Sequence, residues 1–170
     1  MQGAGLTLRE LAGPDLTIAH HLWHSLAYAL KPIDLIHHIP SIFICVICLS
    51  FGWGPVLNIQ ILFLMGIPGG IDYFLLTLIK LKLLHPRVEK NINQSLNVWI
   101  RCPGAMAFAL AMMASPLVQP ANFATDTHRW VTLLCGVHHF WNAGFFMYRT
   151  VDARTRYFIK EKEQKKAKAL

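Results

Sequence analysis

The longest stretch without a basic residue constrains this chain most, because no Lys or Arg occurs between Lys31 and Lys80. Within that stretch Asp34 and Asp72 are the only acidic residues, and most of the others are apolar. About 20 consecutive apolar residues cross the roughly 30 Å of hydrocarbon in a bilayer as one helix. The stretch is therefore long enough for two membrane-spanning helices.

The charge of the whole chain is low and unevenly distributed. Hydrophobic residues make up 54% of the sequence and charged residues 15%, and the net charge is +7. Nine of the sixteen Lys and Arg residues lie after residue 128. A nucleic-acid-binding domain would spread its basic residues over the face of a polar domain, so no nucleic acid is expected as a partner. The basic residues are expected beside anionic lipid headgroups instead.

Four apolar segments are predicted to cross the membrane, at about residues 33–51, 56–84, 97–117 and 129–148. The second is expected to be one bent helix because Pro68-Gly69-Gly70 interrupts it, and Pro103 suits the first turn of the third. Residues 16–31 are expected to form a shorter amphipathic helix, one face of which carries Ile18, Leu22, Ser25 and Leu26. The predicted fold is an all-α, multi-pass transmembrane helix bundle of about four spans plus this N-terminal amphipathic helix.

The basic residues also predict the orientation of the bundle. One transmembrane domain is expected over residues 32–150, preceded by an N-terminal segment, 1–31, and followed by a basic tail, 151–170. With both termini on one side, that side holds every Lys and Arg except Arg129. Because cytoplasmic loops carry an excess of basic residues, both termini are predicted to be cytoplasmic.

The first predicted span begins with an acid and two imidazoles, in the sequence Asp34-Leu-Ile-His37-His38-Ile-Pro-Ser41. Residues three and four apart lie on the same side of a helix, so Asp34 shares a face with both histidines. A carboxylate there can hold an imidazole in one tautomer and make it more basic, as catalytic histidines require. The alternative is structural, because Pro32 and Asp34 also suit a helix N-terminus, where the helix dipole favours a negative side chain.

Asp72 and His138 are two further candidates inside predicted spans. Asp72 follows the Pro68-Gly69-Gly70 break, and broken membrane helices often present an acid to a cavity. His138 lies four residues before Asn142 and shares a helix face with it. The alternative for both is structural, because an acid can pair with a residue on a neighbouring span and a buried His often joins two helices.

The nine histidines raise two metal-binding alternatives. Membrane di-iron enzymes use several His boxes, and His20-His21-x-x-His24 has the inverse of their usual HxxHH order. A b-type haem needs two His from facing helices, such as His37 or His38 with His138 or His139. The sequence marks neither a full set of boxes nor a porphyrin pocket, so no metal site and no resident cofactor is predicted.

At Asp34–Ser41 the chain resembles the TLC-domain family of membrane proteins (the TRAM, Lag1 and CLN8 group). That family carries an acid followed by a His-His pair at the cytoplasmic-side start of a membrane helix, commonly with Thr where this chain has Ser41. Residues 64–73 and 93–104 also resemble uncharacterised eukaryotic members, and the likeness covers about residues 16–150. With about four spans the chain is shorter than a full TLC domain, so part of the usual bundle is missing or replaced by residues 1–31.

The resemblance implies lipid metabolism. Ceramide synthases of this family acylate a sphingoid base from acyl-CoA, and the His-His pair is essential to them. It implies acyl-CoA as a co-substrate, membrane lipids as partners, and the endoplasmic reticulum as the membrane, with a mitochondrial or other organellar membrane as the alternative. The residues implied as catalytic are His37, His38 and Asp34, and those implied to bind substrate are Asp72, Ser41 and His138.

A role without catalysis stays open beside acyl transfer. Many members of the family affect lipid composition, sense lipid or act in trafficking. A short, broadly hydrophobic chain with a basic tail equally suits an accessory subunit of a larger membrane complex, with protein partners in the membrane. A haem or di-iron redox protein is the third alternative.

Overall fold

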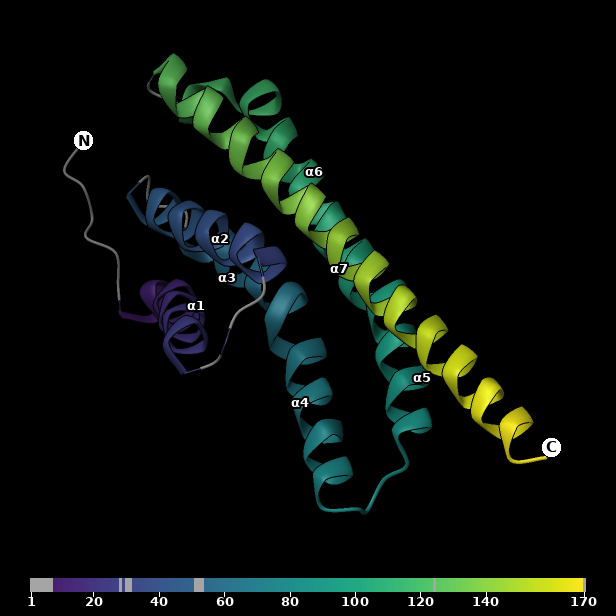
Figure 1. Cartoon of the computed structure of the whole chain (residues 1–170). Helices are drawn as coiled ribbons and strands as arrows, with labels where there is room; N and C mark the ends of the chain where they lie inside the picture. Colours follow the sequence, from purple (N-terminus) through teal and green to yellow (C-terminus); the bar gives the residue numbers. More distant parts are fainter. Residues whose placement is uncertain (1–7, 28, 30–31, 51–53, 124, 170) are drawn as a thin grey trace. The chain divides into compact units, whose positions relative to one another are not determined.

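The computed structural model describes residues 8–27, 29, 32–50, 54–123 and 125–169, and every regular element in these ranges is a helix (Figure 1). This confirms the all-α prediction for the part of the chain that is described. The helices in chain order are α1 (Leu8–Ala27), α2 (Pro32–Ser50), α3 (Gly54–Ile61), η1 (Leu62–Gly66), α4 (Ile67–Lys80), α5 (Pro86–Leu96), η2 (Asn97–Arg101), α6 (Cys102–Val118), η3 (Pro120–Asn122) and α7 (Asp126–Ala167).

Two π-helical turns, η1 and η2, each end two residues before a proline inside a longer helix. Proline has no N–H to donate, and its ring clashes with the carbonyl group four residues earlier. These carbonyls belong to Leu64 before Pro68 and to Trp99 before Pro103, within the π turns. Because a π turn accommodates one extra residue, each helix passes its proline without ending.

The bounds of the helices correct two expectations and extend a third. The third predicted helix begins at Pro86 and not near Asn97, so Pro103 lies inside a long helix and not in its first turn. The helix that contains the fourth predicted span extends from Asp126 to Ala167, beyond both ends of that span. The N-terminal helix begins at Leu8, eight residues before the expected start. In each case polar residues continue the helix beyond the apolar segment from which its length was predicted.

Two helical segments are long and apolar enough to cross a membrane, Asn58–Lys80 and Pro86–Val118. They correspond to the second and third predicted spans. In α2 the described apolar part, His38–Ile47, is shorter than a full span. The segment in α7 contains His138, His139 and Asn142, which lower its mean hydropathy. The first and fourth spans therefore stay predictions.

The described chain divides into two compact units, and each is described by itself. Unit 1 comprises Met1–Leu62 and Ala109–His138, and unit 2 comprises Phe63–Phe108 and His139–Leu170. This division follows contacts within the chain, so the predicted boundaries at residues 31 and 150 stay predictions.

In unit 1, α1 packs against α2 and α3 (Figure 1). The apolar core of this unit is centred on the buried Met112 and Cys135, with Ile44, Ile47, Ile61 and Val131 packed around them. Gly136 in α7 lies so close to α6 that a Cβ there would collide with the Met113 side chain and stand 3.1 Å from the Ala109 carbonyl oxygen. Small residues of this kind let membrane helices approach closely.

Helix α1 turns its polar side inward. The side chain of His21 is only 2% exposed and Thr17 is also buried, whereas Leu26 is 85% exposed and Leu16 and Trp23 are exposed as well. Among the described side chains, Leu16, Leu22, Trp23 and Leu26 therefore lie outside the packed face of this helix, as do Asp15 and His20. An inward polar and outward apolar pattern is the arrangement that a lipid environment favours, because hydrocarbon solvates leucine as well as a protein core does.

In unit 2, α4 and α5 form a helical hairpin, and the C-terminal part of α7 packs against α5. The core contains the buried Leu64, Cys102, Ala105 and Ala143, surrounded by Phe63, Met65, Met106 and Met147. Farther along, the Arg154 guanidinium donates to the Asn91 side chain over 2.8 Å, and the Arg87 guanidinium lies 5.0 Å from the centre of the Phe158 ring.

Helix α4 ends in a Schellman motif with a lysine in the left-handed conformation. The Lys82 N–H donates to the Ile79 carbonyl over 2.9 Å, and the Leu83 N–H donates to the Leu78 carbonyl over 2.9 Å. Lys82 has a φ of 60°, a region that glycine enters without steric cost. The turn therefore has a lysine at a position where the backbone conformation favours glycine.

Lys82→Gly is accordingly expected to stabilise the protein by up to about 1 kcal/mol, because glycine relieves the left-handed backbone. Thermal unfolding of the purified protein in neutral detergent measures this change as a rise in Tm. Lys80→Gly is the control, because Lys80 lies in the last turn of α4 and glycine there should lower Tm. Equal loss of stability in both variants would contradict the strain at Lys82.

Candidate functional site

The strongest cluster of titratable side chains in unit 1 consists of His21 and His24 from α1 and His38 from α2. The centre of the His38 ring lies 5.0 Å from the centre of each of the other two rings. His21 and His38 are buried and His24 is half-buried. The packing of α1 on α2 therefore adds two imidazoles to the predicted His38 position.

The tautomer of His38 follows from the hydrogen bonds of Ser25. The Ser25 hydroxyl donates its only hydrogen to the His21 carbonyl oxygen over 2.7 Å. Its oxygen lies 3.1 Å from Nδ1 of His38 and so acts as the acceptor in that pair. The hydrogen of the neutral His38 ring is therefore on Nδ1, and the lone pair is on Nε2. This is the form in which Nε2 can act as a base or nucleophile.

His21 is held in the same tautomer by the backbone of α1. Its Nδ1 lies 2.8 Å from the Thr17 carbonyl oxygen, which can only accept, so Nδ1 carries the hydrogen. The Thr17 hydroxyl in turn donates to the Gly13 carbonyl over 2.9 Å. Polar groups four residues apart thus form a ladder along the buried side of α1, from Gly13 through Thr17 and His21 to Ser25.

Burial makes His21 a weak base. Desolvation lowers its pKa from 6.5 to about 4, the hydrogen bond with the Thr17 carbonyl opposes this shift, and the neighbouring His38, His20 and His24 lower the pKa further. Burial also lowers the pKa of His20, with a smaller contribution from His24. His21 is therefore neutral near pH 7, and its protonation competes with the packing of α1.

Acidification is expected to detach α1 from α2 and α3. A solvated His21 binds a proton below pH 6.5 but the packed one only near pH 4, so the packing is stable above pH 6.5 and weakens as the pH falls toward 4. The loss is about 1.4 kcal/mol for each pH unit within that window. Hydrogen exchange of the α1 amides at a series of pH values measures it. His21→Gln should remove most of the pH dependence; an unchanged profile in that variant would contradict the role of His21.

The structure places the other residues of the predicted His-His site as follows. Ser41 is buried in α2, three residues after His38 and on the same helix face. The backbone of Asp34 and His37 belongs to α2, but their side chains lie outside the described part of the chain. The proposed contact of Asp34 with the histidines therefore stays a prediction.

The two remaining candidates are His138 and Asp72, and neither is a member of this cluster. His138 belongs to unit 1 and is half-buried, while the adjacent His139 and Asn142 are buried in unit 2. Both histidines are three or four residues from Asn142, so spacing alone does not distinguish which of them shares its buried face. Asp72 belongs to unit 2, where it is half-buried in α4.

Asp72 is the first member of a polar network between α4 and α5. The Asn93 amide nitrogen donates to Oδ1 of Asp72 over 2.7 Å and to Oε1 of Glu89 over 3.3 Å. The Asn97 amide nitrogen donates to Oδ1 of Asn93 over 2.7 Å and to its backbone carbonyl over 2.9 Å. The expected pairing of Asp72 is confirmed, and its partner is an asparagine.

The network is electrically balanced. Nζ of Lys90 lies 2.9 Å from Oε2 of the buried Glu89, and Nη1 of Arg101 donates to Oδ1 of Asn97 over 3.3 Å. The Arg101 guanidinium also lies 4.4 Å from the centre of the Phe146 ring, within the range of a cation–π interaction. The hairpin thus contains two acids and two bases, and Lys90 pairs with the buried Glu89, as buried charges require.

Most of this network was missed from the sequence, as was Ser25. A signal was present, because Glu89, Asn93, Asn97 and Arg101 repeat every four residues and therefore line one side of a helix. The predicted helix began at Asn97, which separated the first two of these residues from the others. Ser25 was placed on an apolar face, where its hydroxyl had no predicted partner.

No group of three or more His, Cys, Asp or Glu side chains in the described ranges is arranged to hold a metal ion. No family model, curated protein or solved structure matches the chain. The residues themselves therefore carry the functional argument. Their chemistry is a buried imidazole whose Nδ1 faces the Ser25 hydroxyl in unit 1, and a hydrogen-bonded polar hairpin in unit 2.

Proposed function

We propose that this chain is a short TLC-like integral membrane protein that binds and acylates a lipid at a site centred on His38. The carrying observation is the Ser25–His38 hydrogen bond, which directs the lone pair of a buried imidazole to Nε2. Surface histidines need no such orientation. A base held in one tautomer beside apolar helices suits a reaction between a thioester and a lipid.

A membrane location is supported by two apolar helices of spanning length and by the inward polar side of α1. Helix α7 adds a third argument. Its exposed Trp130 and Tyr148 are 18 residues apart, or about 27 Å along a helix. Tryptophan and tyrosine concentrate at both interfaces of a bilayer, so this spacing fits the predicted fourth span. We propose the endoplasmic reticulum as the membrane, with both termini cytoplasmic.

In the proposed reaction, Nε2 of His38 accepts a proton from the amine or hydroxyl of the acceptor lipid. The freed electron pair of that nitrogen or oxygen bonds to the acyl carbon of acyl-CoA. The carbon–sulfur bond breaks, and the CoA thiolate leaves with the electron pair and takes the proton back from His38. His37 and Asp34 are proposed as further catalytic groups, and Ser41, Asp72 and His138 as substrate-binding residues.

The exposed aromatic residues favour a second candidate, a non-catalytic subunit of a larger membrane complex. Trp23 in α1 and Trp99 in η2 are both exposed, and such side chains supply large contact areas at protein interfaces. This candidate predicts stoichiometric co-purification of another membrane protein, which is lost on Trp99→Ala. A chain that purifies alone and retains acyl transfer excludes it.

Lipid mass spectrometry on cells tests the proposed activity. Cells carrying His37→Ala with His38→Ala are compared with wild type and with His20→Ala, which removes an exposed imidazole of α1. The proposal expects an acylated lipid to fall, and its unacylated precursor to rise, only in the double variant. Unchanged lipids at an unchanged protein level would exclude catalysis at this site.

A further inference from the structure

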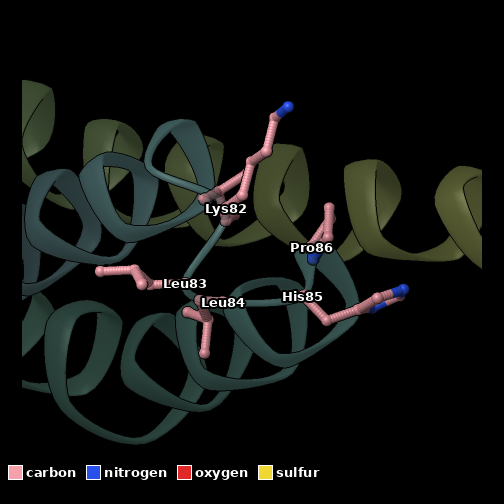
Figure 2. Close-up of a pocket in the computed structure, with 6 residues that line it drawn as sticks. Lys82, Leu83, Leu84, His85 and Pro86 are labelled. Carbon is pink, nitrogen blue, oxygen red and sulfur yellow. The ribbon is translucent and has the colours of Figure 1, made fainter.

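The turn between α4 and α5 forms a surface pocket of about 360 Å³ (Figure 2). The turn joins the two helical segments of membrane-spanning length, so it lies where the first ends and the second begins. The residues that line the pocket are Ile79, Lys82, Leu83, Leu84, His85 and Pro86.

The turn combines exposed apolar and exposed basic side chains. Leu83 is 71% exposed, and Leu81 is exposed beside it. Lys80 and Lys82 are also exposed, and neither forms an ion pair with a described residue. Figure 2 shows the Lys82 side chain extending away from the turn. None of the six lining residues is acidic.

Two donors line the pocket. The ammonium of Lys82 is one, and His85 supplies the other. Nδ1 of His85 accepts the backbone N–H of Arg87 over 3.2 Å as the N-cap of α5, so the hydrogen of the neutral ring is on Nε2. Figure 2 shows the His85 ring extending outward at the opposite end of the turn from Leu83. The pocket is therefore lined by two residues that can donate to an anion, one with an ammonium and one with an imidazole N–H.

The backbone conformation of Lys82 supports a ligand site at this turn. Its φ of 60° is a conformation that glycine would adopt at no cost, whereas an L side chain there is strained. Strained positions persist where the surrounding structure holds them, and they often belong to ligand sites. At Lys82 the strain places a cation at the rim of an apolar pocket.

We propose that this pocket binds the phosphate-containing headgroup of an anionic phospholipid. Lys82 and His85 bind the phosphate, and Leu81 and Leu83 lie among the upper acyl carbons of the same bilayer. The membrane is favoured over a soluble partner because the turn connects the two helical segments of membrane-spanning length and exposes Leu81 and Leu83 beside two lysines. This inference rests on the membrane part of the proposed function and not on its catalytic part.

Native mass spectrometry of the full chain in neutral detergent tests the proposal. The probes are phosphatidylserine, phosphatidylcholine and inorganic phosphate, each titrated separately. Wild type should bind phosphatidylserine more tightly than phosphatidylcholine. Lys82→Gln should weaken phosphatidylserine binding about fivefold, as expected for one basic residue at a membrane surface, and Lys82→Gln with Leu83→Ser should weaken it further.

The control is Lys162→Gln, which removes an equal charge from an exposed position in α7 and should change little. Circular dichroism verifies that each variant keeps its helices. Equal phosphatidylserine binding by wild type and Lys82→Gln would overturn the proposal, as would displacement of the lipid by millimolar inorganic phosphate, which would indicate a free-phosphate site.

Failure of this inference is distinguishable from failure of the proposed function. His38→Gln should leave phosphatidylserine binding intact, because the catalytic and headgroup sites use different residues. A wild-type chain that is soluble without detergent would overturn both the membrane assignment and the headgroup site. A detergent-dependent chain without acyl transfer, but with Lys82-dependent lipid binding, would overturn the catalytic proposal alone.

Discussion

His38→Gln is expected to lower the rate of the proposed acyl transfer by at least about a hundredfold, the usual contribution of a positioned general base. The glutamine amide can still donate to the Ser25 hydroxyl oxygen, which lies 3.1 Å from Nδ1 of His38. It cannot accept a proton at neutral pH, so the packing of α1 on α2 is preserved while the base is lost. Release of free CoA thiol by purified protein, supplied with acyl-CoA and acceptor lipid, measures the rate.

Variants of Ser25 distinguish the orientation of the His38 ring from proton transfer by that ring. Ser25→Ala removes the acceptor that fixes the His38 hydrogen on Nδ1, so a smaller loss is expected, about tenfold, together with a changed pH–rate profile. Ser25→Thr keeps a hydroxyl and should restore both. His20→Gln is the control for histidine loss and should leave the rate unchanged. Full activity of the His38→Gln variant would show that His38 takes no part in the reaction.

Asn97→Leu is expected to cause the largest loss of stability, about 3 kcal/mol, because it leaves several buried polar groups without partners. Asn97 donates twice to Asn93 and accepts from Arg101. Leucine has a similar volume but can replace none of these bonds, so Oδ1 of Asn93 loses its donor and the Arg101 guanidinium loses its acceptor. Thermal unfolding in neutral detergent measures the change as a lower Tm.

Ser95→Leu is the matched control for that experiment. Ser95 lies two residues before Asn97 on the exposed side of α5, so leucine there should leave Tm nearly unchanged. Asn97→Asp tests the charge balance of the network, because it adds a third acid opposite two bases and should also lower Tm. Equal Tm values for wild type and Asn97→Leu would mean that the network contributes no net stability.

The helical fold follows from the sequence because apolar segments of 19 to 29 residues, as in 33–51 and 56–84, exceed any strand and suit a membrane helix. The bend expected in the second helix at Pro68-Gly69-Gly70 stays a prediction. In the structure a π turn, η1, precedes Pro68, and the helix continues through this proline. Hydropathy identifies a helix well but does not mark where polar residues continue it, as at Leu8, Pro86 and Ala167.

The burial of the site residues was harder to predict. Hydropathy favours an inward apolar face for α1, but the packed face carries Thr17 and His21. Which face is inward depends on whether water or lipid surrounds the helix. The sequence of one helix alone does not show which of the two surrounds it. His38 was chosen for its neighbour in sequence, Asp34, whereas its described hydrogen-bond partner, Ser25, lies 13 residues away on another helix.

The π turn η2 changes which side of its helix the following residues lie on. Four residues of an α-helix advance about 40° beyond one full turn, so side chains repeating every four residues drift around its axis. The wider turn offsets part of that drift, which keeps Glu89, Asn97 and Ala105 all buried in unit 2. Deleting one residue of η2 would rotate α5, with its polar network, by about 100° relative to α6, which carries the buried Ala105. The hairpin network and the tightly packed core therefore depend on a single additional residue.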